Sequence, residues 1–136
     1  MTPMRSPCDR GRRGLAAVEF AVCLPVLVLA VFASIEACTM VFLKESLTVA
    51  AYEGSRVALK PGTTEAAVTA RCQQVLTERN VASGSVQIIP GTIGSVTVGN
   101  PLEIRVSAPC EANAIMPVWF YGSTTMSGSS IVMKEY

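Results

Sequence analysis

A long apolar stretch near the N-terminus constrains this chain more than any other feature. From Phe20 to Leu43 the sequence has 24 residues with a single charged side chain, that of Glu36. About 20 apolar residues are enough for a helix to cross a bilayer. We therefore predict one transmembrane pass, in agreement with a composition that is 50% hydrophobic and only 15% charged.

The charges on either side of this stretch predict its orientation. Residues 1–14 carry four arginines and one aspartate, a net side-chain charge of +3, whereas Lys44 and Glu45 just after the stretch cancel. Basic flanks stay on the cytoplasmic side of the membrane. We expect a cytoplasmic N-terminus in the bacterial inner membrane and an extracytoplasmic domain over residues 44–136.

A cleaved secretory signal peptide is the alternative interpretation of a basic start followed by an apolar run. The run is longer than a typical signal core, and no clean Ala-x-Ala site follows it. The sequence IEAC, which ends at Cys38, places Glu36 where a lipoprotein signal has a small or apolar residue. These features disfavour ordinary signal cleavage.

The composition disfavours hydrolytic and metal chemistry. The chain has no histidine, which removes the usual general base and the commonest neutral metal ligand. The sequence has no nucleophile with a base at motif spacing and no phosphate-binding loop, and its net charge of +1 gives no reason to expect nucleic acid. We predict that the protein is not an enzyme and has no cofactor, metal site or small-molecule substrate.

Glu19 is an acidic residue in the apolar sequence GLAAVEFAVCLP, residues 14–25, where an ionised carboxylate is costly. If the chain were cut between Gly14 and Leu15, Leu15 would carry a free α-amino group and Glu19 would be the fifth mature residue. That protonated amine, or the one of a neighbouring helix, would then neutralise the carboxylate. The alternative is a boundary carboxylate that reaches the cytoplasmic headgroups.

The start of this segment resembles a type IV prepilin signal, with basic residues, Gly14, an apolar start and Glu19. Its continuation, with Phe20, Pro25 and Glu36 in these places, is similar to the TadE-like pseudopilins of the tight-adherence (Flp-type) pilus machinery. The sequence AAYEGSRVAL, residues 50–59, resembles the small-residue segment of the same family. Ser55 stands where alanine is usual.

The resemblance implies a processed membrane subunit. A prepilin peptidase would remove residues 1–14, residues 15–43 would remain as a transmembrane and assembly helix, and the partners would be membrane lipid, other pilins or pseudopilins, and the tight-adherence secretion platform. The main Flp pilins are very short and have Glu-Tyr at mature positions five and six. Here Phe20 follows Glu19 and an outer domain is attached, which favours a minor pseudopilin. The alternative is an unprocessed single-pass anchor that displays a binding module.

The assembly residues implied by the resemblance are Glu19, Phe20, Pro25 and Glu36. Pro25 removes one helix hydrogen bond and predicts a kink. Glu36 lies 17 residues beyond Glu19, roughly 25 Å along a helix. Its alternative interpretation is a half-solvated carboxylate near the outer interface.

The remaining residues predict an α+β fold, a pilin-like domain attached to the long N-terminal helix. The helix should continue to Pro61-Gly62 with one apolar stripe, formed by Leu43, Leu47, Ala50, Ala51, Gly54 and Ala58. Its small residues fit core packing or a closely approaching partner helix, and core packing is preferred. A second helix should begin at Thr63 or Thr64. Its inner face and the flank next to it should be formed by Val68, Cys72, Val75, Leu76 and Arg79.

A change to a period of two predicts an antiparallel sheet of three to four strands after the second helix. The expected strands are SVQII at 85–89, SVTVG at 95–99, LEIRVSA at 102–108 and a last strand within SGSSIVMKEY at 127–136.

Two cysteines remain for the outer domain once the leader and the membrane helix are set aside. Cys23 and Cys38 lie in the membrane helix and are most simply small apolar residues. Cys72 and Cys110 lie where an oxidising compartment permits a disulfide, and we predict that they pair. The alternative is two separate thiols.

An aromatic cluster follows in AIMPVWFYG, residues 114–122, which holds Trp119, Phe120 and Tyr121. Aromatic side chains anchor interfaces, so this cluster is a candidate partner patch. The alternatives are a lid on the core of the domain itself and a membrane-facing belt.

Overall fold

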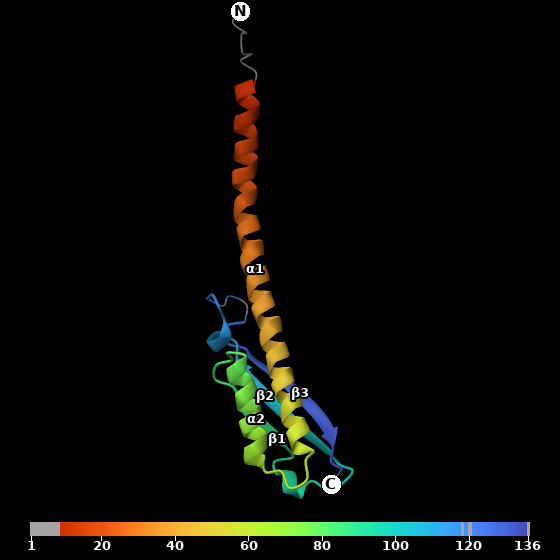
Figure 1. Cartoon of the computed structure of the whole chain (residues 1–136). Helices are drawn as coiled ribbons and strands as arrows, with labels where there is room; N and C mark the ends of the chain where they lie inside the picture. Colours follow the sequence, from red (N-terminus) through yellow and green to blue (C-terminus); the bar gives the residue numbers. More distant parts are fainter. Residues whose placement is uncertain (1–8, 118, 120, 136) are drawn as a thin grey trace, which may run out of the picture. The chain divides into compact units, whose positions relative to one another are not determined.

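The computed structural model describes the backbone of residues 9–117, 119 and 121–135, and side chains from Gly14 onward. Figure 1 shows the order of the elements. The helices are α1 (Asp9–Ala58) and α2 (Glu65–Glu78), and the strands are β1 (Ser85–Ile89), β2 (Pro101–Pro109) and β3 (Thr125–Met133). Two short 3-10 turns, η1 (Ile93–Ser95) and η2 (Glu111–Asn113), lie between the strands. The chain divides after Ile35 into two compact units.

The first unit holds the N-terminal part of α1. The helix runs through Pro25 without interruption, and every side chain from Gly14 to Ile35 is exposed. Among the described residues, α1 is the one helix that is long and apolar enough to cross a membrane, from Gly14 to Ala58. A helix that is apolar on all sides and unburied within its own chain is suited to a hydrocarbon environment, because its backbone groups are satisfied internally.

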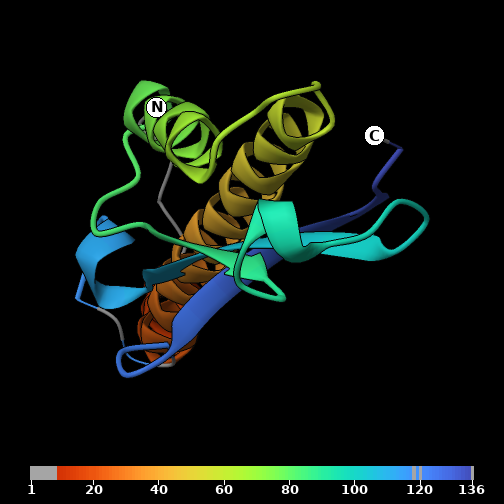
Figure 2. The same cartoon turned by 90° about the horizontal axis from the view of Figure 1, so that it is seen from below.

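The second unit begins at Glu36 and contains the rest of α1, α2 and the sheet. Figure 2 shows α1 and α2 on the same face of the sheet, which gives two layers. The predicted stripe of α1 is confirmed as its buried face, together with Met40. Burial therefore starts at Met40, four residues before the position at which the sequence placed the start of the outer domain.

Helix α2 begins and packs as its sequence predicts. The Oγ1 of Thr64 accepts a hydrogen bond from the backbone N–H of Ala67 at 3.3 Å, and Glu65 lies in the first turn. A side-chain acceptor and an acidic residue at this end both stabilise the exposed N–H groups of the helix. Four of the five residues predicted for the inner face and its flank are buried, namely Val68, Cys72, Val75 and Leu76. The fifth, Arg79, is half-buried at the C-cap of the helix.

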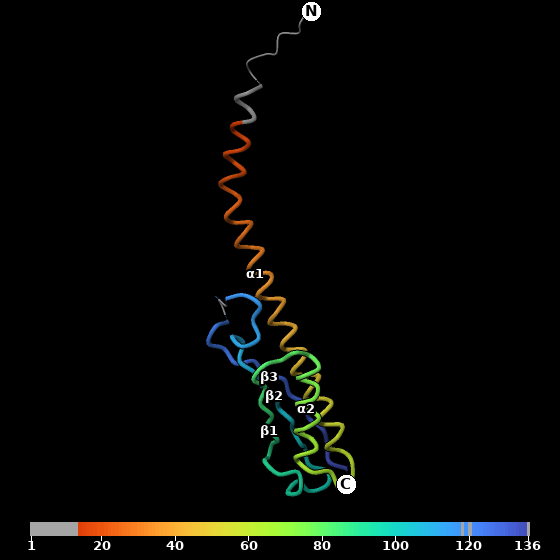
Figure 3. Tube along the Cα trace, turned by 60° about the vertical axis from the view of Figure 1, so that its left-hand side comes forward, coloured from red at the N-terminus to blue at the C-terminus, as the bar shows by residue number. Residues whose placement is uncertain are grey.

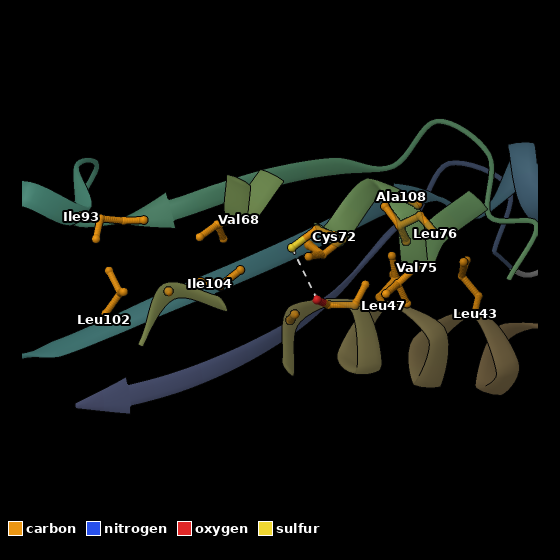
Figure 4. Packing of buried hydrophobic residues seen from close by; sticks show 14 of the residues in the cluster. Leu43, Leu47, Val68, Cys72, Val75, Leu76, Ile93, Leu102, Ile104 and Ala108 are labelled. Atoms are coloured by element: carbon orange, nitrogen blue, oxygen red, sulfur yellow. Dashed lines mark hydrogen bonds between the residues drawn. The ribbon is translucent and has the colours of Figure 1, made fainter. Parts of the chain in front are cut away.

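The sheet is antiparallel, in the order β1-β2-β3, so β2 is the central strand. Its side chains alternate strictly between the two faces. Ile104 on the inner face pairs with Ile88 of β1 and with Ser130 of β3. The buried residues of β2 are Leu102, Ile104, Val106 and Ala108, which meet the helices in one core (Figure 4).

The predicted strand SVTVG is wrong. Ser95 is the last residue of η1, and residues 96–99 continue in a turn. The other three predicted strand segments form the sheet. Val96 is buried in the hydrophobic core but Val98 is exposed, so only one of the two valines packs. Gly99, with φ of +86°, directs the chain back, and its N–H donates to the carbonyl of Lys134 at 2.8 Å.

Strand β3 approaches α1 at a glycine. A β-carbon at Gly128 would lie 2.5 Å from the backbone nitrogen of Thr48, too close for any side chain. On one side of this crossing, Nζ of Lys44 donates to the carbonyl of Ser127. On the other side, the hydroxyl oxygens of Ser55 and Ser130 are 3.1 Å apart. The small residues of β3 thus allow the strand to lie directly against the helix backbone.

Candidate functional site

The predicted processing site lies within helix α1. Gly14 is exposed, and a β-carbon added to it would have no neighbouring atom within 4 Å. Leu15, Glu19 and Phe20 are exposed as well. In the uncut chain the nitrogen of Leu15 belongs to a peptide bond, so the ammonium that would neutralise Glu19 arises only on cleavage.

The sequence AAYEGSRVAL forms the junction between α1 and the rest of the second unit. Glu53 accepts hydrogen bonds from Arg71 of α2 at 3.0 Å and from Arg56 at 3.4 Å. The pKa of Glu53 is held below its ordinary value of 4.5, first by the hydrogen bond from Arg71 and then by the charge of Arg56. This carboxylate therefore joins α1 to α2.

The next two residues of the motif set how closely the elements approach. A β-carbon at Gly54 would lie 2.4 Å from Sγ of Cys72, so only glycine allows α2 to cross here. Ser55 is fully buried, and its hydroxyl donates to the carbonyl of Tyr52 at 2.7 Å while it contacts the Ser130 hydroxyl on β3. The segment that resembles a family motif is thus explained by packing within this chain, and the prediction of core packing for the small residues is confirmed.

Comparison with known proteins gives one family match, which covers most of helix α1. The family model named TadE, described as TadE-like protein, matches residues 14–56. Residues 14–56 are a TadE-like segment. A search of curated proteins and a search of solved structures each gave no match.

The TadE-like segment extends over both units of the structure. It begins at Gly14, the residue before the predicted cleavage point, and ends at Arg56, the last residue of the Glu53–Arg56 ion pair. It covers about a third of the chain. The match agrees with the resemblance to TadE-like pseudopilins found in the sequence.

Glu36 of the TadE-like segment has a role that the sequence did not reveal. Its Oε1 accepts a hydrogen bond from the backbone N–H of Tyr121 at 3.1 Å, although 85 residues separate the two. This hydrogen bond fixes the loop before β3 to α1. Figure 3 shows the course of this loop, in blue, beside the helix. A charge inside an apolar run was the available signal, but no local pattern reveals a partner so far along the chain.

The predicted aromatic patch is only partly described by the structure. Trp119 is 68% exposed and Tyr121 is 37% exposed, so neither side chain is part of the hydrophobic core. Phe120 lies outside the described residues.

The structure has free thiols in place of the predicted disulfide. Cys72 and Cys110 are both buried and unpaired with each other. The sulfur of Cys72 faces α1, where it donates to the carbonyl of Ala50 at 3.4 Å (Figure 4), whereas Cys110 lies beyond the end of β2. Burial raises the pKa of Cys72 to about 11 and also raises that of Cys110, so both are protonated at neutral pH.

The described residues offer no metal centre, since no group of three or more Cys, Asp or Glu side chains among them is placed to hold an ion. A hollow of about 320 Å³ is lined by Glu53, Arg56, Val57, Lys60 and Arg71. The carboxylate of Glu53 already accepts hydrogen bonds from Arg56 and Arg71, which line the same hollow. The hollow therefore lies at the α1–α2 junction.

Proposed function

We propose that this protein is a minor pseudopilin that is processed by a prepilin peptidase and required for assembly of a tight-adherence pilus. The supporting observation is the coincidence of three features at one end of α1. The TadE-like match starts at Gly14, the helix from Gly14 to Ile35 is exposed, and Glu19 stands five residues later in an apolar sequence. The protein would act by packing against other subunits, without catalysis.

The membrane-spanning part is proposed to extend from Leu15 to Ile35. These 21 residues are about 32 Å long as a helix, which matches the thickness of about 30 Å of the hydrocarbon layer. Met40 and Leu43 are buried in the outer domain, so they are not available to lipid. This span is shorter than the predicted 15–43 and begins at the proposed mature N-terminus. The N-terminus is proposed to face the cytoplasm of the inner membrane.

Cleavage after Gly14 would place an ammonium group at the membrane boundary, four residues from Glu19. The ammonium of one subunit and the carboxylate of a neighbour would attract each other strongly in this environment of low dielectric constant. This charge pair would favour side-by-side packing of the apolar helices and would be absent from the uncut precursor.

The test is co-purification of other pilus subunits with the membrane-extracted protein, using Glu19→Gln. We expect processing to continue but co-purification to fall about tenfold or more, because a charged pair in low dielectric is lost. Glu45→Gln is the matched control, since Glu45 is an exposed acid of the same helix within the outer domain. Normal recovery of partners with Glu19→Gln would contradict the proposed pairing and favour the unprocessed anchor.

A further inference from the structure

The loop between η2 and β3 displays apolar side chains that the core of the domain does not use. Ile115 is 80% exposed and Trp119 is 68% exposed, and Met116 is exposed beside them. Residues 114–124 have the sequence AIMPVWFYGST, without a single charge. Exposed aliphatic and aromatic side chains in an uncharged stretch are typical of an interaction site.

The base of this loop is held by hydrogen bonds on both sides. The N–H of Cys110 donates to the carbonyl of Thr124 at 3.0 Å, and the N–H of Thr124 donates to the carbonyl of Tyr121 at 3.0 Å. Nδ2 of Asn113 donates to the carbonyls of Pro109 and Ala82, at 2.9 and 3.0 Å. The exposed side chains are therefore carried by an anchored base.

The position of the loop follows from its bond to Glu36. The backbone of Tyr121 donates to this carboxylate at 3.1 Å, and Glu36 directly follows the 21 residues assigned to the membrane. The loop thus lies beside Glu36, the first residue of the second unit, where α1 continues from the apolar segment. Tryptophan and tyrosine concentrate at this level of membrane proteins, because their rings are apolar and their N–H and O–H groups reach water and headgroups.

We infer that the loop centred on Ile115 and Trp119 is a second membrane contact, inserted into the headgroup region of the outer leaflet beside the point where α1 emerges. The occupant of this apolar surface is lipid. A protein partner could bind at any distance from the membrane. The absence of charge in the loop and its attachment at Glu36 therefore both favour lipid. This inference rests on the proposed membrane anchoring and is independent of the role in the pilus.

Trp119 allows a direct test, because it is the single tryptophan of the chain. The full chain is reconstituted at low protein density in vesicles of phosphatidylglycerol and phosphatidylcholine, with bromine on the acyl chains near either the headgroup or the tail end. Fluorescence of Trp119 is compared with that of Tyr52→Trp in a Trp119→Phe background. Tyr52 is exposed and lies 16 residues past Glu36, about 24 Å along the helix.

We expect bromine near the headgroup to quench Trp119 at least about twofold more than bromine near the tail end, as for a residue of the interfacial belt. Aqueous iodide should quench it weakly. The tryptophan at residue 52 should be quenched strongly by iodide. Neither of the two brominated lipids should quench it.

A second control separates this inference from the proposed anchoring. Phe32→Trp, also in the Trp119→Phe background, places the probe in the apolar segment, where bromolipid should quench it. If this probe is quenched but Trp119 is quenched only by iodide, the loop inference is overturned and the anchoring stands. If Trp119 is shielded from both quenchers, protein covers it and the inference is again overturned. If bromolipid quenches neither probe, both proposals fail.

Discussion

The two parts of helix α1 use apolar residues in opposite ways. From Gly14 to Ile35, large side chains such as Val22 and Leu27 are exposed all around the helix. From Glu36 to Ala58, a stripe of mostly small residues is buried, and Gly54 admits the sulfur of Cys72. The first part depends on overall apolarity without a preferred face, as a lipid environment requires. The second part depends on the exact size of each side chain on one face.

The comparison is tested most strongly by the same substitution in the two parts. Leu47→Ala removes a side chain with 0% exposure and should lower the free energy of unfolding of the outer domain by about 2 to 5 kcal/mol. Leu27→Ala, at a position 55% exposed, should change it by less than about 0.5 kcal/mol. Denaturant unfolding of the micelle-bound chain, followed by circular dichroism of the domain, measures both. Equal effects would contradict the division of the helix.

A smaller effect should follow from adding one methyl group where β3 crosses α1. Gly128→Ala directs its β-carbon at the backbone of Thr48, which cannot move aside as a flexible side chain would. We expect a loss of about 1 to 3 kcal/mol from overpacking. Gly94→Ala is the control, since its β-carbon would have no neighbour within 4 Å. If Gly128→Ala unfolds at the same denaturant concentration as Gly94→Ala, the close approach of strand and helix is wrong.

The smallest expected effect is the pH dependence of the fold's stability that Glu53 causes. Its pKa is below 4.5 in the folded chain because Arg71 and Arg56 favour the carboxylate. The bonds of the ionised form therefore stabilise the fold above about pH 4.5, and this contribution is lost as the pH falls through the lowered folded pKa. Glu53→Gln should be slightly less stable than the original chain at pH 7, and the difference should shrink toward pH 3. Unfolding midpoints of both chains against pH measure this, and a difference that is constant over the range would exclude the ion pairs as its cause.

The sequence predicted the elements whose signals are local and repeated. The stripe from Leu43 to Ala58 was visible because its spacing continues over four turns. Thr64 and Glu65, a capping side chain followed by an acidic residue, together indicate a helix start. SVTVG misled because alternation over five residues also arises in a turn that buries Val96 alone. A period of two is therefore weak evidence for a strand when the segment ends in a glycine with positive φ, such as Gly99.

The contacts between distant parts of the chain could not be predicted from one sequence. Glu36 with Tyr121, and Gly128 with Thr48, depend on how strands and loops return to α1, which no local spacing encodes. The cysteines show the same limit. The compartment made a disulfide permissible, but Cys72 faces α1, so it does not meet Cys110.

The central claim is that the working form of this protein begins at Leu15, with a free amine four residues before Glu19. The direct measurement is the intact mass and N-terminal sequence of the protein extracted from membranes of cells that make the pilus. We expect a chain that starts at Leu15 in these cells, and the uncut chain when Gly14→Leu blocks cleavage. A membrane-bound chain that still starts at Met1, or within residues 1–14, would contradict it.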